Sequence, residues 1–246
     1  MFPTLKEIRE AADRIKPYVH RTPVLTSESL NKQVGAQVYL KCENFQKTGA
    51  FKYRGACNAV YSVSDEEVKC GVCTHSSGNH AQAVALAARM RGIPAYIVMP
   101  NNAPLVKINA VAEYGGKITF CEPTLAAREN TLDRINRDTG SHFIHPYDNE
   151  GVISGHGTAV LELIADVPNL DVVIAPVGGG GLLSGTSIAA TEVKSGIRVI
   201  GGEPAMADDA YRSMKADKIL PSINPNTIAD ALLASLGKLA FPIIQH

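Results

Sequence analysis

The sequence predicts an α/β fold in which open, mostly parallel sheets are covered by helices on both faces. Strand-like and helix-like segments alternate along most of the chain, which is the pattern of parallel sheets with crossover helices. The run 172–177, VVIAPV, is apolar throughout, as a strand that is buried on both faces requires. Two loops rich in glycine or small polar residues each lie between such a strand and a helix.

The individual elements follow from local patterns in chain order. A capping box formed by Thr4 and Glu7 starts a helix with an apolar face at helical spacing, and Pro17 ends this helix. Strands are expected at 23–25, 37–41, 69–74, 95–99, 117–121, 142–145, 171–177 and 197–202, and further helices at 81–91, 126–138, 158–165 and 182–194.

Composition excludes several classes of function. The 246-residue chain has 45% hydrophobic and 20% charged residues, the profile of a globular protein with a sizeable core. Its 24 basic and 24 acidic residues cancel, which argues against binding to a nucleic-acid backbone. No apolar run is long enough to cross a membrane, and the charged start is unlike a signal peptide. Five cysteines, an odd number, predict reduced thiols and a cytoplasmic setting.

The clearest motif is a run of four glycines, Gly178, Gly179, Gly180 and Gly181, between a buried strand and a helix. Backbone without side chains lets several N–H groups point at one anion, and the helix N-terminus adds partial positive charge, so we expect a phosphate here. A tight turn alone would need only one glycine. A dinucleotide fold would use an acid such as Glu203, but the G-x-G-x-x-G spacing fails at its last glycine.

A second loop, Ser76-Ser77-Gly78-Asn79-His80, also lies between a strand and a helix. Its hydroxyls, amide and backbone N–H groups at a helix N-terminus suit a carboxylate better than a bulky phosphate. Taken alone, the loop is equally consistent with an ordinary helix cap.

The third feature is Lys52, which lies between Phe51 and Tyr53 in a segment bounded by glycines. The ordinary state of a lysine is a solvated surface charge. A desolvated lysine, however, has a lowered pKa and forms a Schiff base with an aldehyde. A lysine, a phosphate cradle and a carboxylate loop together indicate pyridoxal phosphate and an amino-acid substrate.

Several segments, in order along the chain, carry a resemblance to a known family. They are HRTPVLTS, KCENFQKTGAFKYRGA, THSSGNHAQAVA, GIPAYIVMP, VGGGGLLSG, EPAMADDA and TIAD. The chain resembles the serine racemase and serine/threonine dehydratase branch of the fold-type II (tryptophan synthase β-like) pyridoxal-phosphate enzymes over nearly its whole length. His80 favours this branch, because the related cysteine synthases have threonine at that position.

The resemblance implies a role for each matching position. Lys52 would hold the cofactor and act as the base on one face of the substrate Cα, and Ser77 would be the acid/base on the opposite face. Phe51 would pack beside the cofactor ring, and Asn79 would reach its ring hydroxyl. The remaining implied contacts are Ser76, Ser77, Asn79, His80 and Arg128 to the substrate, and Gly178, Gly179, Gly180 and Gly181 to the phosphate.

The resemblance also implies a cation site. Glu203, Ala207 and Asp209 match the pattern of metal-activated members, and two carboxylates with a carbonyl give hard oxygen ligands for Mg²⁺, Ca²⁺ or Mn²⁺. Without the resemblance, these acids would indicate a solvated acidic turn. Cys70 and Cys73 have the spacing of half a zinc site or a redox pair, but the absence of a second pair predicts a structural role.

The implied activity is an ammonia-lyase that converts L-serine, L-threonine or a similar β-hydroxy amino acid into a 2-oxo acid and ammonia. The same site allows racemisation of serine as a second reaction. Two alternatives stay open. One is an enzyme that is predominantly a serine racemase, and the other is a truncated, catalytically weak protein that binds the cofactor.

The implied layout is a large cofactor-binding domain of residues 1–71 and 148–246, with a small domain of residues 72–147 inserted. Relatives continue beyond this chain, so the large domain is expected to lack its usual C-terminal part, including the Ser or Thr that faces the pyridine nitrogen. His156 stands where relatives usually have glutamine. A homodimer is expected, and Glu28 and Ser29 depart from the nucleotide-binding pattern of mammalian relatives, which argues against an ATP effect.

Overall fold

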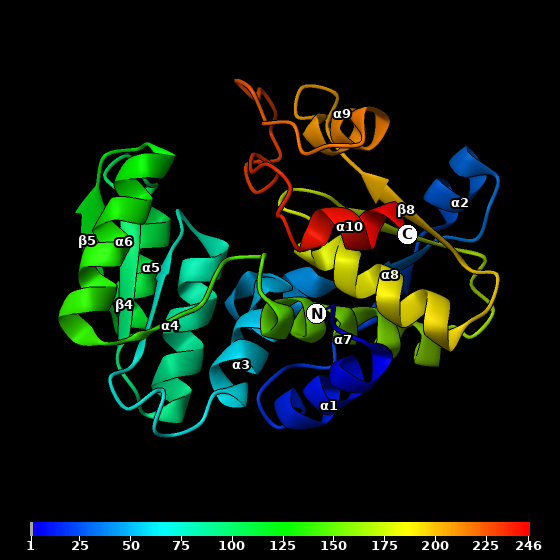
Figure 1. Ribbon diagram of the computed structural model, residues 1–246. Helices are drawn as coiled ribbons and strands as arrows, with labels where there is room; N and C mark the ends of the chain where they lie inside the picture. The colour runs from blue at the N-terminus through cyan, green and yellow to red at the C-terminus, as the bar shows by residue number, and fades with distance from the viewer. Residues whose placement is uncertain (1) are drawn as a thin grey trace.

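The structure, a computed structural model, describes residues 2–246 (Figure 1). Its helices are α1 (Leu5–Ile15), α2 (Glu28–Val34), α3 (Lys52–Ser62), α4 (Asn79–Arg91), α5 (Leu105–Glu113), α6 (Leu125–Thr139), α7 (Glu150–Asp166), α8 (Gly181–Val193), α9 (Asp209–Ala216) and α10 (Ala240–Gln245). Its strands are β1 (Val24–Thr26), β2 (Tyr39–Lys41), β3 (Val72–His75), β4 (Ala95–Pro100), β5 (Gly116–Cys121), β6 (His142–Phe143), β7 (Val172–Pro176) and β8 (Arg198–Gly202). Two short 3₁₀ turns, η1 (Glu43–Phe45) and η2 (Lys47–Gly49), lead into α3.

The helices begin and end where their local chemistry predicts. The backbone N–H of Thr4 donates to the Glu7 carboxylate at 2.9 Å, so the predicted capping box starts α1. At the start of α7, the side chain of Asn149 accepts a hydrogen bond from the Val152 N–H at 2.9 Å. α4 ends at Gly92, whose φ of 77° is left-handed and favours glycine.

The strands form three separate sheets. Four parallel strands in the order β5-β4-β3-β6 make the largest sheet, in which Ala95 of β4 pairs with Val72 of β3 and Gly116 of β5. β7 and β8 form a parallel pair, and β1 and β2 form an antiparallel pair. Figure 1 shows β4 and β5 with α5 and α6 on one side of the molecule and α8, α9 and α10 on the other. The prediction of open, mostly parallel sheets with helices is confirmed.

Two apolar cores hold these layers together. The larger core joins α3, α4 and β4 through residues such as Tyr53, Val84 and Ile97, while a second core joins α1, α7, β7 and α8 through residues such as Ile8 and Val173. The expected domain boundary after residue 71 separates the sheets, but the larger core extends across it. The two-domain division therefore stays a prediction.

Glycines bring three helices into unusually close contact behind the sheets. A Cβ atom on Gly155 of α7 would lie 2.5 Å from the backbone oxygen of Arg54 in α3. A Cβ atom on Gly185 of α8 would lie 2.4 Å from the backbone oxygen of Ile153 in α7. No real side chain fits at such distances. The helices α3, α7 and α8 therefore stack backbone against backbone.

The structure extends the sequence prediction in several places. The helix expected at 158–165 begins earlier, at Glu150, and each predicted strand is present with shifted bounds. Five helices were not anticipated: α2, α3, α5, α9 and α10. Within residues 2–246, no helix combines the length and the apolar character that crossing a bilayer would require.

Candidate active site

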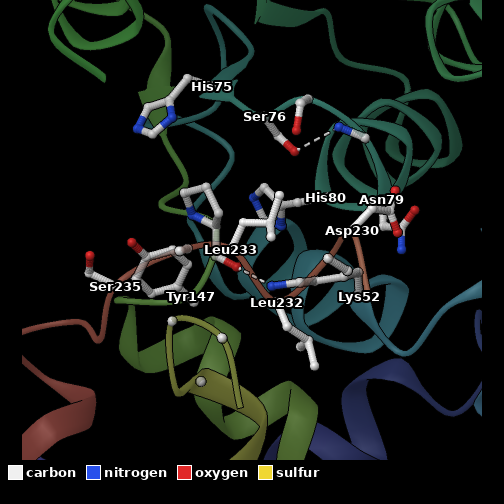
Figure 2. A pocket seen from close by; sticks show the side chains of 18 of the residues that line it. Lys52, His75, Ser76, Asn79, His80, Tyr147, Asp230, Leu232, Leu233 and Ser235 are labelled. Atoms are coloured by element: carbon white, nitrogen blue, oxygen red, sulfur yellow. Dashed lines mark hydrogen bonds between the residues drawn. The ribbon is translucent and has the colours of Figure 1, made fainter. Parts of the chain in front are cut away.

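Lys52 is the first residue of α3, and its side chain lines a cavity of about 540 Å³ (Figure 2). Its Nζ donates a hydrogen bond to the carbonyl oxygen of Pro146 at 2.8 Å and lies 5.3 Å from the centre of the Phe51 ring. Burial lowers the pKa of Lys52 from 10.5 to about 8. A larger share of the amine is therefore neutral near neutral pH, as attack on an aldehyde requires.

The turn that carries Lys52 is anchored by Arg54, which is fully buried. The Arg54 guanidinium forms ion pairs with Glu43 and Glu162, each at 2.8 Å. Lys41 adds a second cation to Glu162 at 2.6 Å. Removing one partner from such a buried network would leave an uncompensated charge. The network therefore holds the start of α3 in one orientation.

The glycine loop lies across the cavity from Lys52, between β7 and α8. Only Gly180 needs glycine for its backbone angle, with a φ of 89°. Gly179 and Gly181 are required by close approach: a Cβ on Gly179 would lie 2.3 Å from the Tyr147 ring, and one on Gly181 would lie 2.8 Å from the Tyr147 carbonyl oxygen. The loop thus exposes backbone N–H groups at the start of α8, where the helix favours an anion.

In contrast to the glycine loop, the loop between β3 and α4 presents mainly side chains to the cavity. Ser76 Oγ accepts a hydrogen bond from the Gly78 N–H at 3.2 Å, while Ser77 is exposed at the cavity wall. α4 begins at Asn79, so its first N–H groups lack intrahelical partners and are available to an anion. A Cβ on Gly78 would lie 2.7 Å from Cδ of Lys107, so that lysine packs on the loop.

His80 is the second residue of α4 and is almost fully buried at the cavity wall. Its Nε2 lies 3.4 Å from the carbonyl oxygen of Ile144. Burial, followed by the charge of Lys52, holds the pKa of His80 well below its usual value. The imidazole is therefore neutral, with the proton on Nε2 facing Ile144.

The cavity brings together all the residues that we expected to contact cofactor or substrate. They are Phe51, Lys52, Ser76, Ser77, Asn79, His80, Arg128, Gly178, Gly179, Gly180 and Gly181. The three expected metal ligands are not among its lining residues. Arg128, in the first turn of α6, is half-buried, and its Nε lies 3.4 Å from the Thr124 carbonyl oxygen. No carboxylate pairs with Arg128 among the residues that the structure describes.

Residues 230–235, which we call the strap, cross the mouth of the cavity (Figure 2). Asp230 at one end forms an ion pair with Lys107 of α5. Just beyond the other end, the Gly237 N–H donates to the Gly179 carbonyl oxygen at 3.1 Å. The strap therefore links the edge of the four-stranded sheet with the glycine loop. Sequence patterns did not predict the strap, because within this region only the tetrapeptide 227–230 forms a recognisable motif.

The cavity also has an aromatic wall that no sequence motif predicted. The rings of His145 and Tyr147 meet edge to face at 4.7 Å, and His75 lies 6.0 Å from His145. Burial lowers the pKa of His75 to about 4, so this ring is neutral. His145 Nδ1 accepts the Asp148 N–H at 2.9 Å, which fixes the turn that carries Pro146 and Tyr147. The sequence signal that could have indicated this wall is His145, a histidine that lies just after the strand β6.

The residues of the expected cation site lie beside α9. The Glu203 carboxylate accepts hydrogen bonds from the Ala210 and Tyr211 N–H groups at 3.0 and 2.9 Å. Asp209 is 1% exposed, and one of its oxygens accepts the Leu236 N–H at 3.3 Å. Burial raises the pKa of both carboxyl groups. Within the described residues, no cluster of three or more His, Cys, Asp or Glu side chains could hold a metal ion.

The fold and the cavity define a class of enzyme. A buried lysine with a lowered pKa faces a backbone phosphate cradle and a helix start that favours a carboxylate, which suits a phosphorylated aldehyde cofactor. The family model "Pyridoxal-phosphate dependent enzyme" matches residues 15–246, and the chain belongs to this family.

Two relatives and one solved structure are closely similar to this chain. It is 52% identical to the serine racemase of Arabidopsis thaliana over 238 residues, 97% of this chain and 72% of the relative. It is 48% identical to the β-hydroxyaspartate dehydratase of Paracoccus denitrificans, over 99% of this chain and 78% of the relative. The structure of maize serine racemase matches with a TM-score of 0.98 and 48% identity, covering 100% of this chain and 74% of that one.

The residues present fit pyridoxal phosphate. Lys52 offers the amine, the loop Gly178–Gly181 lines the cavity with backbone that carries no side chains, and the Phe51 ring lies beside Lys52. The cavity volume of about 540 Å³ is sufficient for a small cofactor together with an amino acid.

Proposed function

We propose that this protein is a pyridoxal-phosphate-dependent ammonia-lyase for small β-hydroxy amino acids of the L-serine and L-threonine type. Such a substrate first loses its β-hydroxyl as water, and one water is then consumed when the resulting imine is hydrolysed, so the net products are a 2-oxo acid and ammonia. Racemisation of serine is the second reaction that we assign to the site. The observation that carries the proposal is Lys52, a buried amine with a pKa near 8, in one cavity with Ser77 and the glycine loop.

The residues have distinct tasks in this scheme. Pyridoxal phosphate, when bound, supplies an electron sink for the charge left on the substrate Cα. Lys52 removes and returns the Cα proton on its own face, and Ser77 does so on the opposite face. The first N–H groups of α4, with Asn79 and Ser76, bind the substrate carboxylate. The glycine loop binds the phosphate, and the strap with Phe51 restricts access of water.

The balance between the two reactions depends on Ser77. Elimination from an L-amino acid needs a base on one face of Cα only, whereas racemisation needs proton transfer on both faces. Ser77 is exposed at the cavity wall, on the loop between β3 and α4 whose side chains line the cavity. This supports both activities in one site. The names of the similar proteins include both racemases and ammonia-lyases, which also supports the pair.

Lys52→Ala provides the direct test of the proposed function. We expect wild-type protein loaded with pyridoxal phosphate to develop the visible absorbance of a lysine-bound cofactor and to release 2-oxo acid from L-serine or L-threonine. The variant should lose both properties and remain folded by circular dichroism. Borohydride reduction that labels a lysine other than Lys52 would contradict the assignment.

We further propose a Mg²⁺, Ca²⁺ or Mn²⁺ site formed by Glu203, Asp209 and the Ala207 carbonyl. Burial is the main cause of the raised pKa of Glu203, and the nearby charge of Asp209 adds to it. Asp209 is itself buried, and one of its oxygens accepts the Leu236 N–H at 3.3 Å. A divalent cation would relieve this repulsion with the oxygen ligands that it prefers.

A cytoplasmic homodimer completes the proposal. All five cysteines are free thiols in the structure, which supports a reducing compartment. Leu105 and Val106 of α5 are 75% and 73% exposed, and such apolar side chains are common where subunits meet. Light scattering of the purified protein tests the dimer directly, and a monomeric mass at micromolar concentration would contradict it.

A further inference from the structure

Asp148 is not among the residues that line the cavity, and the proposed reaction does not use it. Its carboxylate accepts hydrogen bonds from three consecutive backbone N–H groups, those of Lys238, Leu239 and Ala240, at 3.0, 2.8 and 3.3 Å. Within residues 2–246 no ion pair involves Asp148, so backbone donors take the place of a cation. Hydrogen bonds to a charged group are stronger than those between neutral groups. We call residues 236–240, which include these donors, the anchor segment.

The anchor segment packs directly on the glycine loop. The Gly237 N–H donates to the Gly179 carbonyl oxygen at 3.1 Å. A Cβ atom on Gly180 would lie 2.8 Å from the Cβ of Ala240 and 2.9 Å from Cδ2 of Leu236. No side chain fits into a gap of that size. Any shift of the anchor segment is therefore passed on to the backbone of the loop that we expect to hold the phosphate.

Asp148 also belongs to the turn, residues 145–148, that contacts Lys52. His145 Nδ1 accepts the N–H groups of Asp148 and Tyr147 at 2.9 and 3.3 Å, which fixes the path of the turn. Pro146 lies inside it, and its carbonyl oxygen accepts the hydrogen bond from Lys52 Nζ at 2.8 Å. The backbone of Asp148 is thus tied to the partner of Lys52, while its side chain is tied to the anchor segment.

An ordinary helix cap does not account for this arrangement. The neighbouring Asn149 is such a cap, because its side chain accepts the Val152 N–H at 2.9 Å within the first turn of α7. The donors to Asp148 lie 90 to 92 residues further along the chain. A Cβ atom on Gly237 would overlap the Asp148 carboxylate, so the anchor segment approaches as closely as a bare backbone allows. The contact joins two distant segments that adjoin Lys52 and the glycine loop.

We propose that Asp148 is a positioning residue, which holds the anchor segment against the turn 145–148 and so fixes the glycine loop relative to Lys52. This inference rests on the proposed function of Lys52. The strap, residues 230–235, runs directly into the anchor segment, so the same carboxylate keeps the strap at the mouth of the cavity. A cofactor that binds both Lys52 and the glycine loop tightens the anchor segment, and this coupling depends on Asp148.

Cofactor affinity and hydrogen exchange test the two parts of this proposal. In Asp148→Ala, the dissociation constant for pyridoxal phosphate, followed by visible absorbance, should rise about tenfold or more, because three hydrogen bonds to a charged group are lost. In wild type, saturating pyridoxal phosphate should slow deuterium exchange of the amides 238–240 by about fivefold or more. In the variant these amides should exchange rapidly with or without the cofactor.

Asp148→Asn should have a much smaller effect. Its amide oxygen can still accept the N–H groups of Leu239 and Ala240, which donate to one oxygen of Asp148. The dissociation constant should stay within about threefold of wild type, because only the charge and the bond to the exposed Lys238 are lost.

Asn149→Ala is the matched control. Asn149 is adjacent to Asp148 and also accepts a backbone N–H, but within α7 alone, and it does not line the cavity. This variant should lower the melting temperature and speed exchange at the start of α7. Cofactor affinity and the effect of the cofactor on the amides 238–240 should stay at wild-type values. If Asp148→Ala does not fold, Gly237→Ala carries the same expectation, because its Cβ would displace the anchor segment from the carboxylate.

The outcomes distinguish this inference from the proposed function. An Asp148→Ala or Gly237→Ala protein with wild-type cofactor affinity would overturn the positioning role, and so would an Asp148→Asn protein that binds as weakly as Asp148→Ala. Wild-type protein in which the cofactor leaves exchange at 238–240 unchanged, or an equal loss of affinity in Asn149→Ala, would overturn it too. Wild-type protein whose reduced cofactor is found on a lysine other than Lys52 would instead refute the proposed function.

Discussion

The two strand-to-helix loops of the cavity solve similar tasks with opposite chemistry. Each follows a parallel strand and opens a helix, α4 in one case and α8 in the other. The α4 loop presents Ser76, Ser77 and Asn79, whereas the α8 loop presents only backbone and packs against Tyr147. A phosphate with a fixed place needs many rigid donors, which backbone N–H groups supply. A group that moves protons must be a side chain.

Ser77→Ala tests this division most strongly. Loss of the acid/base on one face should remove L-to-D conversion of serine and dehydration of D-serine by about 10²- to 10⁴-fold, the usual contribution of a positioned proton donor. Dehydration of L-serine or L-threonine should continue, because Lys52 serves the other face. Chiral chromatography and 2-oxo acid detection with both enantiomers measure this. Full racemase activity in the variant would show that another group or water supplies the second proton.

Gly179→Ala should be the most damaging small change in the α8 loop. The φ of Gly179 is not in the left-handed region, so the added Cβ acts only through its overlap with the Tyr147 ring. Overpacking of this kind costs about 1–3 kcal/mol, equivalent to about a fivefold to 150-fold weakening of cofactor binding if the loop moves. Titration with pyridoxal phosphate measures it.

Gly202→Ala is the matched control for that change. A Cβ at Gly202 on β8 would meet no atom closer than 3.9 Å among the described residues. Cofactor affinity should stay at the wild-type value. Combining Gly179→Ala with Tyr147→Ala should recover part of the loss, since the overlapping ring is removed. If the two substitutions weaken cofactor binding by the product of their separate effects, the added Cβ acts on the phosphate site and not through its overlap with the Tyr147 ring.

A smaller effect is expected on the free energy of unfolding, because the lowered pKa of Lys52, which faces both loops, makes stability depend on pH. Its pKa is about 8 in the folded protein against 10.5 for the ordinary side chain. Between these values the unfolded chain binds more protons, so the stability contribution of Lys52 rises with pH. Cofactor-free Lys52→Met should therefore be more stable than wild type at neutral pH, and the difference should narrow up to pH 10.5. Urea unfolding across this range measures it, and a constant difference would contradict the lowered pKa.

The smallest expected effect concerns the proposed cation site of Glu203, Ala207 and Asp209, which lies outside both loops. Mg²⁺ or Ca²⁺ should raise the melting temperature of wild type and not of Glu203→Ala, because a ligand that binds only the folded state stabilises it. For a chain of this size each kcal/mol corresponds to about 2–4 °C. Glu192→Ala, which removes an exposed acid on α8, should keep the wild-type shift. Equal shifts in wild type and Glu203→Ala would contradict the site.

Local sequence signals predicted the parts of the molecule whose chemistry is local. The capping box of α1 and the presence of β7 required no knowledge of the rest of the chain. The expectation that β7 is buried on both faces was wrong, because its residues alternate between buried and exposed and Ile174 is 69% exposed. α3 was missed, because KYRGACNAVYS contains a glycine and is buried on almost every side, so it has no amphipathic pattern. The start of α7 was missed because Gly155 and Gly157 weaken the helix signal. Both glycines serve contacts with distant helices, which a local pattern does not contain.

The candidate active site shows the same contrast between local motifs and long-range contacts. Lys52, the glycine loop and the α4 loop, which line one cavity in the structure, could be picked out from the sequence because each is a short motif with a chemical reason for its composition. The strap, Tyr147 and the aromatic wall were not found, since their place depends on segments about a hundred residues away along the chain. Lys107 shows this clearly: it is an ordinary surface charge in sequence, and only folding pairs it with Asp230.

The backbone stack of α3, α7 and α8 has a consequence for how such a protein changes over generations. Because Gly155 and Gly185 leave no side chain between the helices, the separation of the Lys52 turn from the glycine loop is set by the thickness of the peptide itself. Substitutions at the cavity rim, such as those at Ser77, Arg128 or the strap, leave that separation untouched. Substitutions there can therefore change which amino acid fits the cavity, while the span between Lys52 and the glycine loop stays the same.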